Sequence, residues 1–164
     1  MALPTAPVDE AGADQSGCYN LALRHRPRIL PELPGSQDSC YTQGVYTSAA
    51  ETLEAATIRK FDYCYEKLRL KPGDHILTVG PGWGAWFEYA SRRGIKCTGI
   101  SISRSSIDYL QRRARELSYD WELSHDLLAY QTDQRYDAIV IMGVIEHLPP
   151  YGRVLAKFVS LLRP

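Results

Sequence analysis

The chain has no excess of charge of either sign and no long apolar run. Lys plus Arg and Asp plus Glu each total 19 among its 164 residues, so no overall field attracts nucleic acid or an anionic membrane. No stretch approaches the roughly 18 apolar residues that cross a bilayer, and the first residues lack the basic start and apolar centre of an export signal. These absences predict a cytoplasmic protein with no nucleic-acid partner and at most peripheral membrane contact.

Cysteine is scarce as well, and its spacing argues against two kinds of site. The four cysteines, at positions 18, 40, 64 and 97, form no Cys-x-x-Cys pair. That pair is typical of zinc sites and of redox-active dithiols. We therefore expect no metal site and four reduced thiols.

Composition divides the chain into three parts. Residues 1–17 are rich in Ala, Pro, Gly, Asp and Ser and have few large apolar side chains, which predicts a disordered tail. Residues 18–46 contain scattered prolines and tyrosines without a period, which predicts a loop-rich segment that covers a cofactor or substrate. Residues 47–164 carry regular helix and strand patterns, and we expect them to form the folded domain.

The patterns in residues 47–164 predict an α/β fold. Ser48 and Glu51 match a capping box, so a first helix is expected to begin at Ser48. Strands that alternate with helices predict a Rossmann-like parallel sheet with helices on both faces and ligand binding at the carboxyl ends of the strands. The expected strands are 75–79, 96–101, 121–123 and 137–142, and the further helices are 83–93, 107–117 and 154–162.

The last predicted strand, 137–142, is almost wholly apolar. Such a strand normally has a neighbour on each side, yet the sequence holds no pattern for a fifth strand. We therefore expect the fold to be incomplete at its C-terminus. We also expect it to be marginally stable or to form a homo-oligomer through this strand.

Three glycines follow the first strand, in the loop Gly80-Pro-Gly82-Trp-Gly84. Small residues let the backbone approach a ligand closely, and the free N–H groups of such a loop face the polar part of the ligand. The expected ligand is nucleotide-like. The same loop also matches the dinucleotide pattern Gly-x-Gly-x-x-Gly/Ala, so the loop by itself leaves a nicotinamide cofactor open.

The end of the second strand helps to separate these cofactors. A nicotinamide site wants an acidic residue there, and residues 101–106 contain serines and Arg104 but no carboxylate. NAD is therefore disfavoured, whereas Arg104 could meet the 2′-phosphate of NADP, which keeps NADP as an alternative. Serine hydroxyls can donate to and accept from both ribose and an amino-acid carboxylate, which suits a cofactor that carries both parts.

Several stretches taken together resemble one enzyme family. They are Asp38-Ser39-Cys40, Thr52-Leu53-Glu54, Lys60 with Asp62, Lys67 to Gly73, Val79 to Gly84, Thr98 to Ser103 and Glu146-His147. In this order they resemble the cyclopropane-fatty-acyl-phospholipid synthase and mycolic acid methyltransferase family, whose members are class I methyltransferases that use S-adenosylmethionine. The resemblance implies C-methylation or cyclopropanation of an unsaturated fatty-acyl or lipid-like acceptor.

The resemblance also implies roles for matching residues. The glycines with Trp83 would line the methionine part of the cofactor, and Ser101 and Ser103 its ribose side. Asp126 with Leu127 would line its adenine, and Asp38 and Ser39 would close over it from the N-terminal segment. The implied cofactor-binding residues are Asp38, Ser39, Thr78, Gly80, Gly82, Trp83, Gly84, Ser101, Ser103, Ser106, Asp126 and Leu127. Cys40 and Glu146 are the implied catalytic residues, because in the family they help to hold a bicarbonate ion that acts as the base.

The sequence departs from the family at some of these positions. Thr78 stands where the family usually has aspartate, so the loop lacks a charge near the ammonium group of the cofactor. Ser106 takes the place of a glutamine, and residues 41–43 lack the usual aromatic finish of the Ser-Cys motif. These differences favour a divergent acceptor. They keep two alternatives open: a methyltransferase for a small natural product, and a non-catalytic or NADP-binding Rossmann fragment.

Overall fold

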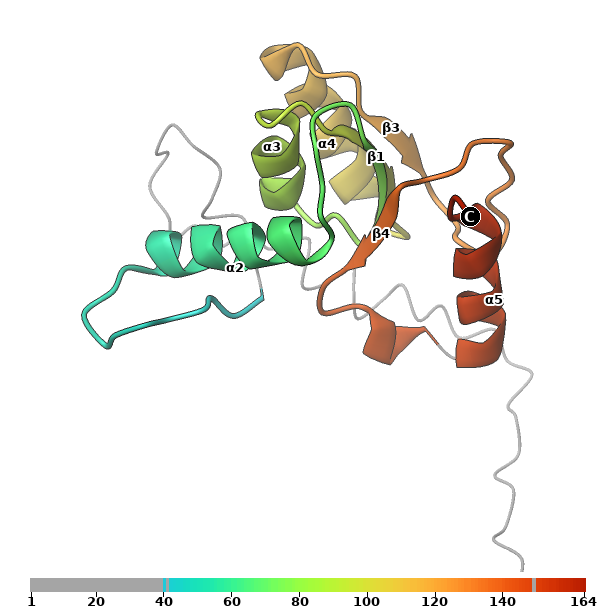
Figure 1. Ribbon diagram of the computed structural model, residues 1–164. Helices are drawn as coiled ribbons and strands as arrows, with labels where there is room; N and C mark the ends of the chain where they lie inside the picture. The colour runs from blue at the N-terminus through green and yellow to red at the C-terminus, as the bar shows by residue number, and fades with distance from the viewer. Residues whose placement is uncertain (1–39, 41, 149) are drawn as a thin grey trace, which may run out of the picture.

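The computed structural model describes residues 40, 42–148 and 150–164, so the predicted tail 1–17 and most of the predicted segment 18–46 lie outside the described residues. Within the described part, four parallel strands form one sheet in the order β3-β2-β1-β4 (Figure 1). The strands are β1 (His75–Val79), β2 (Lys96–Ile100), β3 (Glu122–Ser124) and β4 (Ala138–Ile141). Each strand overlaps its predicted range, and the predicted parallel α/β fold is confirmed.

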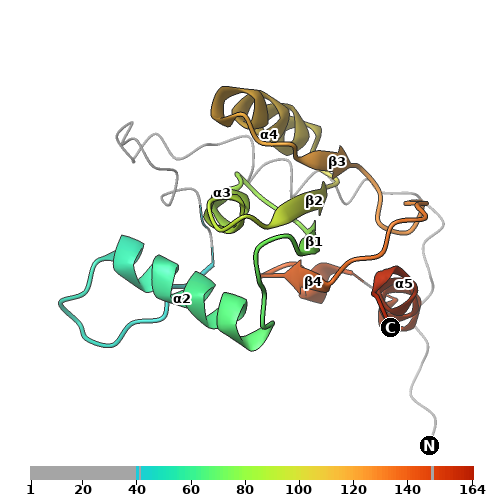
Figure 2. The same ribbon diagram turned by 45° about the horizontal axis from the view of Figure 1, so that its top comes forward.

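Helices lie on both faces of the sheet, as predicted. They are α2 (Leu53–Lys67), α3 (Ala85–Ser91), α4 (Arg104–Leu117) and α5 (Tyr151–Leu161), with a short 3-10 helix, η2 (Ile145–His147), after β4. Figure 2 shows α2 and α3 on one side of the strands and α5 on the other. Because all the strands are parallel, their carboxyl ends meet at one edge of the sheet, where ligands bind in folds of this kind.

The core follows the alternation of side chains along the strands. Ile76 of β1 belongs to a cluster that contains side chains of α2, α3 and α4, among them Phe61 and Phe87. The next residue, Leu77, belongs to a second cluster on the α5 side, which includes Val154. The alternation of β1 therefore divides the core between the two layers of helices.

The predicted start of the first helix is wrong. The helix α2 begins after Thr52, whose side-chain oxygen accepts the N–H of Ala55 at 3.2 Å, and not at Ser48. Glu51, the other half of the predicted capping box, pairs with Arg59 instead. The hydrogen bond from Arg59 lowers the pKa of the Glu51 carboxyl to about 2. Serine and threonine are both favoured at helix N-caps, so the sequence offers two competing start signals.

The strand β4 lies at an edge of the sheet. Within the described part of the chain, β1 is the strand that pairs with it, with Leu77 opposite Ile139. A parallel bridge between Tyr136 and Leu162 ties the end of α5 to the residue that precedes Asp137. This placement agrees with the lack of a fifth strand pattern, and self-association through β4 stays a prediction.

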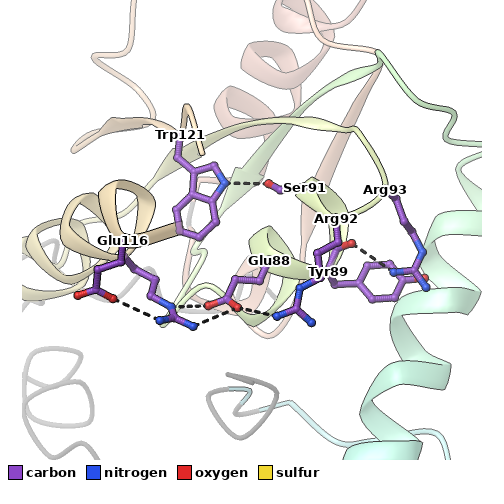
Figure 3. Close-up of polar contacts among 8 residues, drawn as sticks. Glu88, Tyr89, Ser91, Arg92, Arg93, Glu116 and Trp121 are labelled. Carbon is purple, nitrogen blue, oxygen red and sulfur yellow. Dashed lines mark hydrogen bonds and ion pairs between the residues drawn. The ribbon is translucent and has the colours of Figure 1, made fainter. Parts of the chain in front are cut away.

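A buried carboxylate joins α3 to α4 (Figure 3). The side chain of Glu88 is 3% exposed, and it accepts hydrogen bonds from Arg113 of α4 at 2.8 and 3.4 Å. These bonds raise the pKa of the Arg113 guanidinium above its ordinary value. Arg92 contacts the same carboxylate at 3.4 Å, and Glu116 contacts Arg113 at 3.2 Å. The buried charge is therefore satisfied inside the chain.

Candidate functional site

The glycine loop follows β1 at the carboxyl edge of the sheet. Gly80, Gly82 and Gly84 all have a left-handed backbone, with φ of 73°, 56° and 89°, which residues with a Cβ rarely adopt. At Gly80 and Gly84 packing also excludes a side chain, because a Cβ would lie 2.4 Å from Val144 and 2.5 Å from Leu110. At Gly82 no described residue lies within 4 Å of that position. The backbone of Gly82 therefore borders space that no described residue fills.

The predicted serines support this loop. Ser106 on the first turn of α4 is fully buried, and its hydroxyl donates to the carbonyl of Gly82 at 2.5 Å. Ser103 caps α4 by accepting the N–H of Ser106 at 3.3 Å, and its own N–H donates to the Ser101 hydroxyl at 3.2 Å. The serines thus form a chain of hydrogen bonds that ends on the loop. Their contact with ribose stays a prediction.

Thr78, the residue before the last of β1, carries a buried hydroxyl without a partner. It is 4% exposed, and no described residue hydrogen bonds to its Oγ1. A buried hydroxyl without a hydrogen bond costs free energy, so such a group indicates a place for a water molecule or a ligand. Together with the bare backbone at Gly82, it fits a ligand that carries polar groups.

The other predicted cofactor residues are packed in the core, exposed in a turn, or outside the described residues. Trp83 is 9% exposed and meets an α4 tyrosine ring edge to face at 5.1 Å, so it packs on α4. Asp126 follows β3, is exposed, and accepts two backbone N–H groups of the next turn at 2.8 and 3.1 Å. Leu127 is buried in the cluster on the α5 side. Asp38 and Ser39 lie outside the described residues, and the roles of all five stay predictions.

Thr42, two residues after the predicted catalytic Cys40, lies against the turn that follows β4. Thr42 Cγ2 is 2.9 Å from the position that a Cβ on Gly143 would take. The next residue of that turn, Val144, packs against Gly80 in the glycine loop. Cys40 itself is half-buried. The structure therefore brings the predicted catalytic cysteine to the same edge of the sheet as the loop.

Glu146 lies in η2, shortly after that turn. It is exposed, and the hydroxyl of Tyr151 contacts its backbone carbonyl at 3.5 Å. No described residue donates a hydrogen bond to its carboxylate, so the carboxylate is accessible to a ligand. The catalytic roles of Glu146 and Cys40 stay predictions.

Sequence reasoning assigned no role to Lys60, which the structure places beside Cys40. The ammonium group lies 3.0 Å from Cys40 Sγ and 2.5 Å from Thr42 Oγ1. A signal was present in the pattern of α2, because Lys60 lies midway between Ala56 and Cys64 on one helix face. The face that contains Ala56 is buried, and a lysine on a buried helix face is unusual unless it has partners.

The structure also contains a polar cavity of about 450 Å³ away from this edge. Its lining includes Arg135 and residues near the C-terminal end of α5, so it lies by the amino end of β4. Among the residues described, no group of His, Cys, Asp and Glu side chains is arranged to hold a metal ion. In the same part of the chain, no helix is long and apolar enough to cross a membrane.

The parallel sheet, the glycine turn after its first strand and the helices on both faces define a Rossmann-like α/β fold. Comparison with known families is more specific, because residues 33–162 match the family described as Mycolic acid cyclopropane synthetase. This match includes well over half of the chain. The chain belongs to that family, as its motifs implied.

Two curated relatives of this chain have different functions. The cyclopropane-fatty-acyl-phospholipid synthase of Escherichia coli (strain K12) is 34% identical over 119 residues, which cover 71% of this chain and 29% of the relative. The (S)-coclaurine N-methyltransferase of Papaver somniferum is 29% identical over 142 residues, which cover 84% and 40%. The chain thus spans less than half the length of either relative.

A solved structure supports the same fold. The mycolic acid cyclopropane synthase CmaA1, complexed with SAH and CTAB, superimposes with a TM-score of 0.66 at 27% identity. The superposition covers 76% of this chain and 45% of the synthase chain. The fold is therefore that of the class I methyltransferases.

Proposed function

We propose that this chain is part of an S-adenosylmethionine-dependent methyltransferase that acts on carbon of an unsaturated fatty-acyl or lipid-like acceptor. Family membership and the name of the Escherichia coli relative support the acceptor. The bound SAH named for the related synthase structure supports the cofactor. One observation carries the proposal: Gly82 exposes backbone that no described residue covers, and Thr78, four residues earlier, has a buried hydroxyl to which no described residue hydrogen bonds.

In this proposal the chain holds the amino-acid part of the cofactor at the glycine loop. Backbone N–H groups there can donate to its carboxylate, and the Thr78 hydroxyl can accept from its ammonium group. Because threonine is neutral, we expect weaker binding than an aspartate at this position would give. The bound cofactor would supply an electrophilic methyl group.

The proposed acceptor explains why an anion is needed at the same edge. An isolated alkene is a poor nucleophile, so it must be held in line with the methyl group in a site without water. Adding the methyl group leaves a carbocation, and loss of a proton from the new methyl group then closes a cyclopropane. Cys40 and Glu146 are proposed to hold a bicarbonate ion that takes this proton.

The first experiment tests the glycine loop. Gly82→Ala adds a methyl group in the proposed ligand space and strains a backbone with φ of 56°. We expect calorimetry to show affinity for S-adenosylhomocysteine about 10- to 100-fold below wild type, because one or two hydrogen bonds to a charged ligand group are lost. Gly152→Ala in α5 is the matched control, because nothing lies within 4 Å of its added Cβ. Equal affinity in the two variants would contradict the proposal.

The same titration separates the cofactors. Wild-type protein should bind S-adenosylmethionine and S-adenosylhomocysteine, and NADPH should not bind. Arg104 begins α4 just after the β2 edge and is exposed, so a 2′-phosphate could reach it. Binding of NADPH alone would replace the proposal with the NADP-binding alternative.

A second candidate is methylation of a small natural product at nitrogen or oxygen. The observation that favours it is the coclaurine N-methyltransferase match, which covers 84% of this chain. Glu146→Gln separates the two, with Glu116→Gln on exposed α4 surface as control. Cyclopropanation in unsaturated phospholipid vesicles should fall about 100-fold in Glu146→Gln and respond to bicarbonate, because the base is lost. A heteroatom transfer that ignores both changes would support the second candidate.

We further propose that the protein works in the cytoplasm and reaches a lipid acceptor by peripheral contact. The three described cysteines, Cys40, Cys64 and Cys97, are free thiols, which suits a reducing compartment. Assembly into a homo-oligomer remains part of the proposal. Sedimentation of the protein alone would test it directly.

A further inference from the structure

The ammonium group of Lys60 meets three acceptors on the segment that contains Cys40. Its Nζ lies 3.0 Å from Cys40 Sγ, 3.1 Å from the carbonyl of Thr42 and 2.5 Å from Thr42 Oγ1. An ammonium group has three donors and no acceptor, so these contacts can use its whole capacity. Lys60 is half-buried, which makes hydrogen bonds from its charge stronger than they would be in water. One side chain of α2 therefore ties down both residues.

The direction of these hydrogen bonds matters for the site. Because Lys60 cannot accept, both the thiol of Cys40 and the hydroxyl of Thr42 accept from it. The two atoms are 3.3 Å apart, and either can donate to the other. One hydrogen is used between them, and the other is left without an acceptor inside this group. We call this group of Lys60, Cys40 and Thr42 the clamp. Within the clamp, either the thiol or the hydroxyl keeps a hydrogen that none of the three residues accepts, next to the lysine charge.

The clamp also lies in contact with the cofactor loop through one turn. Thr42 abuts Gly143 after β4, and Val144 of the same turn abuts Gly80. We propose that Lys60 is a positioning residue of the methyl-transfer site: it holds Cys40 and Thr42 in place, with Thr42 against the turn after β4, and so supports the cofactor loop on that side. This inference rests on the proposed function and adds a residue to its site.

Lys67 provides a matched comparison on the same helix. Its ammonium group lies 5.4 Å from the centre of the Tyr63 ring, which is also part of α2. Lys67→Met therefore makes the same chemical change as Lys60→Met. It does so at a lysine whose contact with a ring lies within α2 and does not involve Cys40 or Thr42. Any general effect of losing a lysine from α2 should appear in both variants.

The first measurement follows backbone hydrogen exchange of residues 42–46 without ligand. Lys60→Met should speed this exchange about tenfold, because the clamp no longer holds the segment, and Lys67→Met should not. Thr42→Val, which keeps the branched shape but removes one acceptor, should have a smaller effect. The double variant should exchange no faster than Lys60→Met, since both changes break the same contacts. Additive effects, or equal exchange in the two lysine variants, would overturn the clamp.

The second measurement is affinity for S-adenosylhomocysteine. Lys60→Met should bind about tenfold more weakly than Lys67→Met at a similar unfolding midpoint, because the loop loses its cover. Lys60→Arg should recover part of this loss, since a guanidinium also donates several N–H groups. Equal affinity in the two methionine variants, or no recovery by arginine, would overturn the positioning role.

The two measurements keep the two proposals apart. A wild-type chain that does not bind S-adenosylhomocysteine would remove the proposed function, and with it the positioning role. The exchange of residues 42–46 would still decide whether Lys60 holds the segment. Normal binding by the wild type with unchanged exchange in Lys60→Met would remove the clamp alone.

Discussion

The contact between α3 and α4 and the end of β1 each bury a polar side chain, but only the first provides it with a partner among the described residues. Glu88 is almost fully buried, and its carboxylate is bound by Arg113 and Arg92. Thr78 is equally buried, and no described residue bonds to its hydroxyl. A buried polar group therefore does not by itself mark a ligand site. The useful signal is a buried polar side chain to which no described residue hydrogen bonds, close in sequence to backbone that no described side chain covers.

Removing the satisfied charge should have the largest effect. Glu88→Ala leaves the guanidinium of Arg113, whose side chain is 25% exposed, without its main partner. We expect the free energy of unfolding to fall by about 2 to 4 kcal/mol, somewhat below the cost for a fully buried pair because water reaches Arg113. Urea denaturation followed by circular dichroism would measure this change.

The control for this change is Glu116→Ala on the same network. Glu116 has a side chain that is 62% exposed, and it contacts Arg113 at 3.2 Å. Its removal should cost less than about 0.5 kcal/mol, because exposed ion pairs contribute little. Similar losses in the two variants would show that burial does not separate the two carboxylates.

A smaller effect is expected from removing the serine hydroxyl that hydrogen bonds to the glycine loop. Ser106→Ala removes the buried hydrogen bond to the carbonyl of Gly82. We expect a loss of about 1 to 2 kcal/mol in unfolding free energy, because that carbonyl then lacks a partner. Affinity for S-adenosylhomocysteine should also fall about threefold to tenfold as the loop loosens. Ser160→Ala, at an exposed serine whose hydroxyl donates to the carbonyl of Lys157 in its own helix α5, should leave affinity near wild type and cost less stability than Ser106→Ala.

The smallest predicted effect concerns acidification. His75 lies at the start of β1, and its Nε2 is 2.8 Å from Thr98 Oγ1. Burial lowers the pKa of His75 below its ordinary value of 6.5. As pH falls, the unfolded chain therefore takes up a proton before the folded chain does. The contribution of His75 to the free energy of unfolding is therefore fully present above pH 6.5, and it decreases as the pH falls below that value.

Unfolding midpoints in urea between pH 7.5 and 5.5 would test this statement. Wild-type protein should lose stability over this range more steeply than His75→Gln, whose amide can still bond to Thr98 but does not titrate. Identical slopes for the two proteins would show that His75 is not the group responsible. The result sharpens the comparison because His75, which is half-buried, has a partner, as the buried Glu88 does.

The sheet could be predicted from sequence because its strands carry dense apolar runs between clear turn signals. The strand His75–Val79 agrees with its predicted range at both ends. The start of α2 could not be fixed in the same way, since Thr52 and Ser48 are both good caps. In the structure Glu51 is bound by Arg59, which lies in the second turn of the helix, and does not complete the predicted capping box. Such a contact exists only after folding, so local sequence does not reveal it.

The candidate site shows the same division. The glycine loop was recognisable because three glycines follow a strand, and the structure gives each a left-handed backbone. The contact of Ser106 with Gly82 joins residues 24 positions apart, and that of Lys60 with Cys40 joins residues 20 apart. Neither contact has a local pattern. Residue type predicted which part of the chain forms the candidate site, whose ligand role stays a prediction, and tertiary packing determined which side chains support the loop.

The central claim is that the bare backbone of the loop after β1 binds the amino-acid end of S-adenosylmethionine. The most direct measurement is a titration of ¹⁵N-labelled protein with S-adenosylhomocysteine, followed by amide chemical shifts. We predict saturable shifts that are largest at Gly80, Gly82 and Gly84 and absent at Gly152. Saturable shifts elsewhere that leave the loop unchanged, or no shifts at all, would contradict the claim.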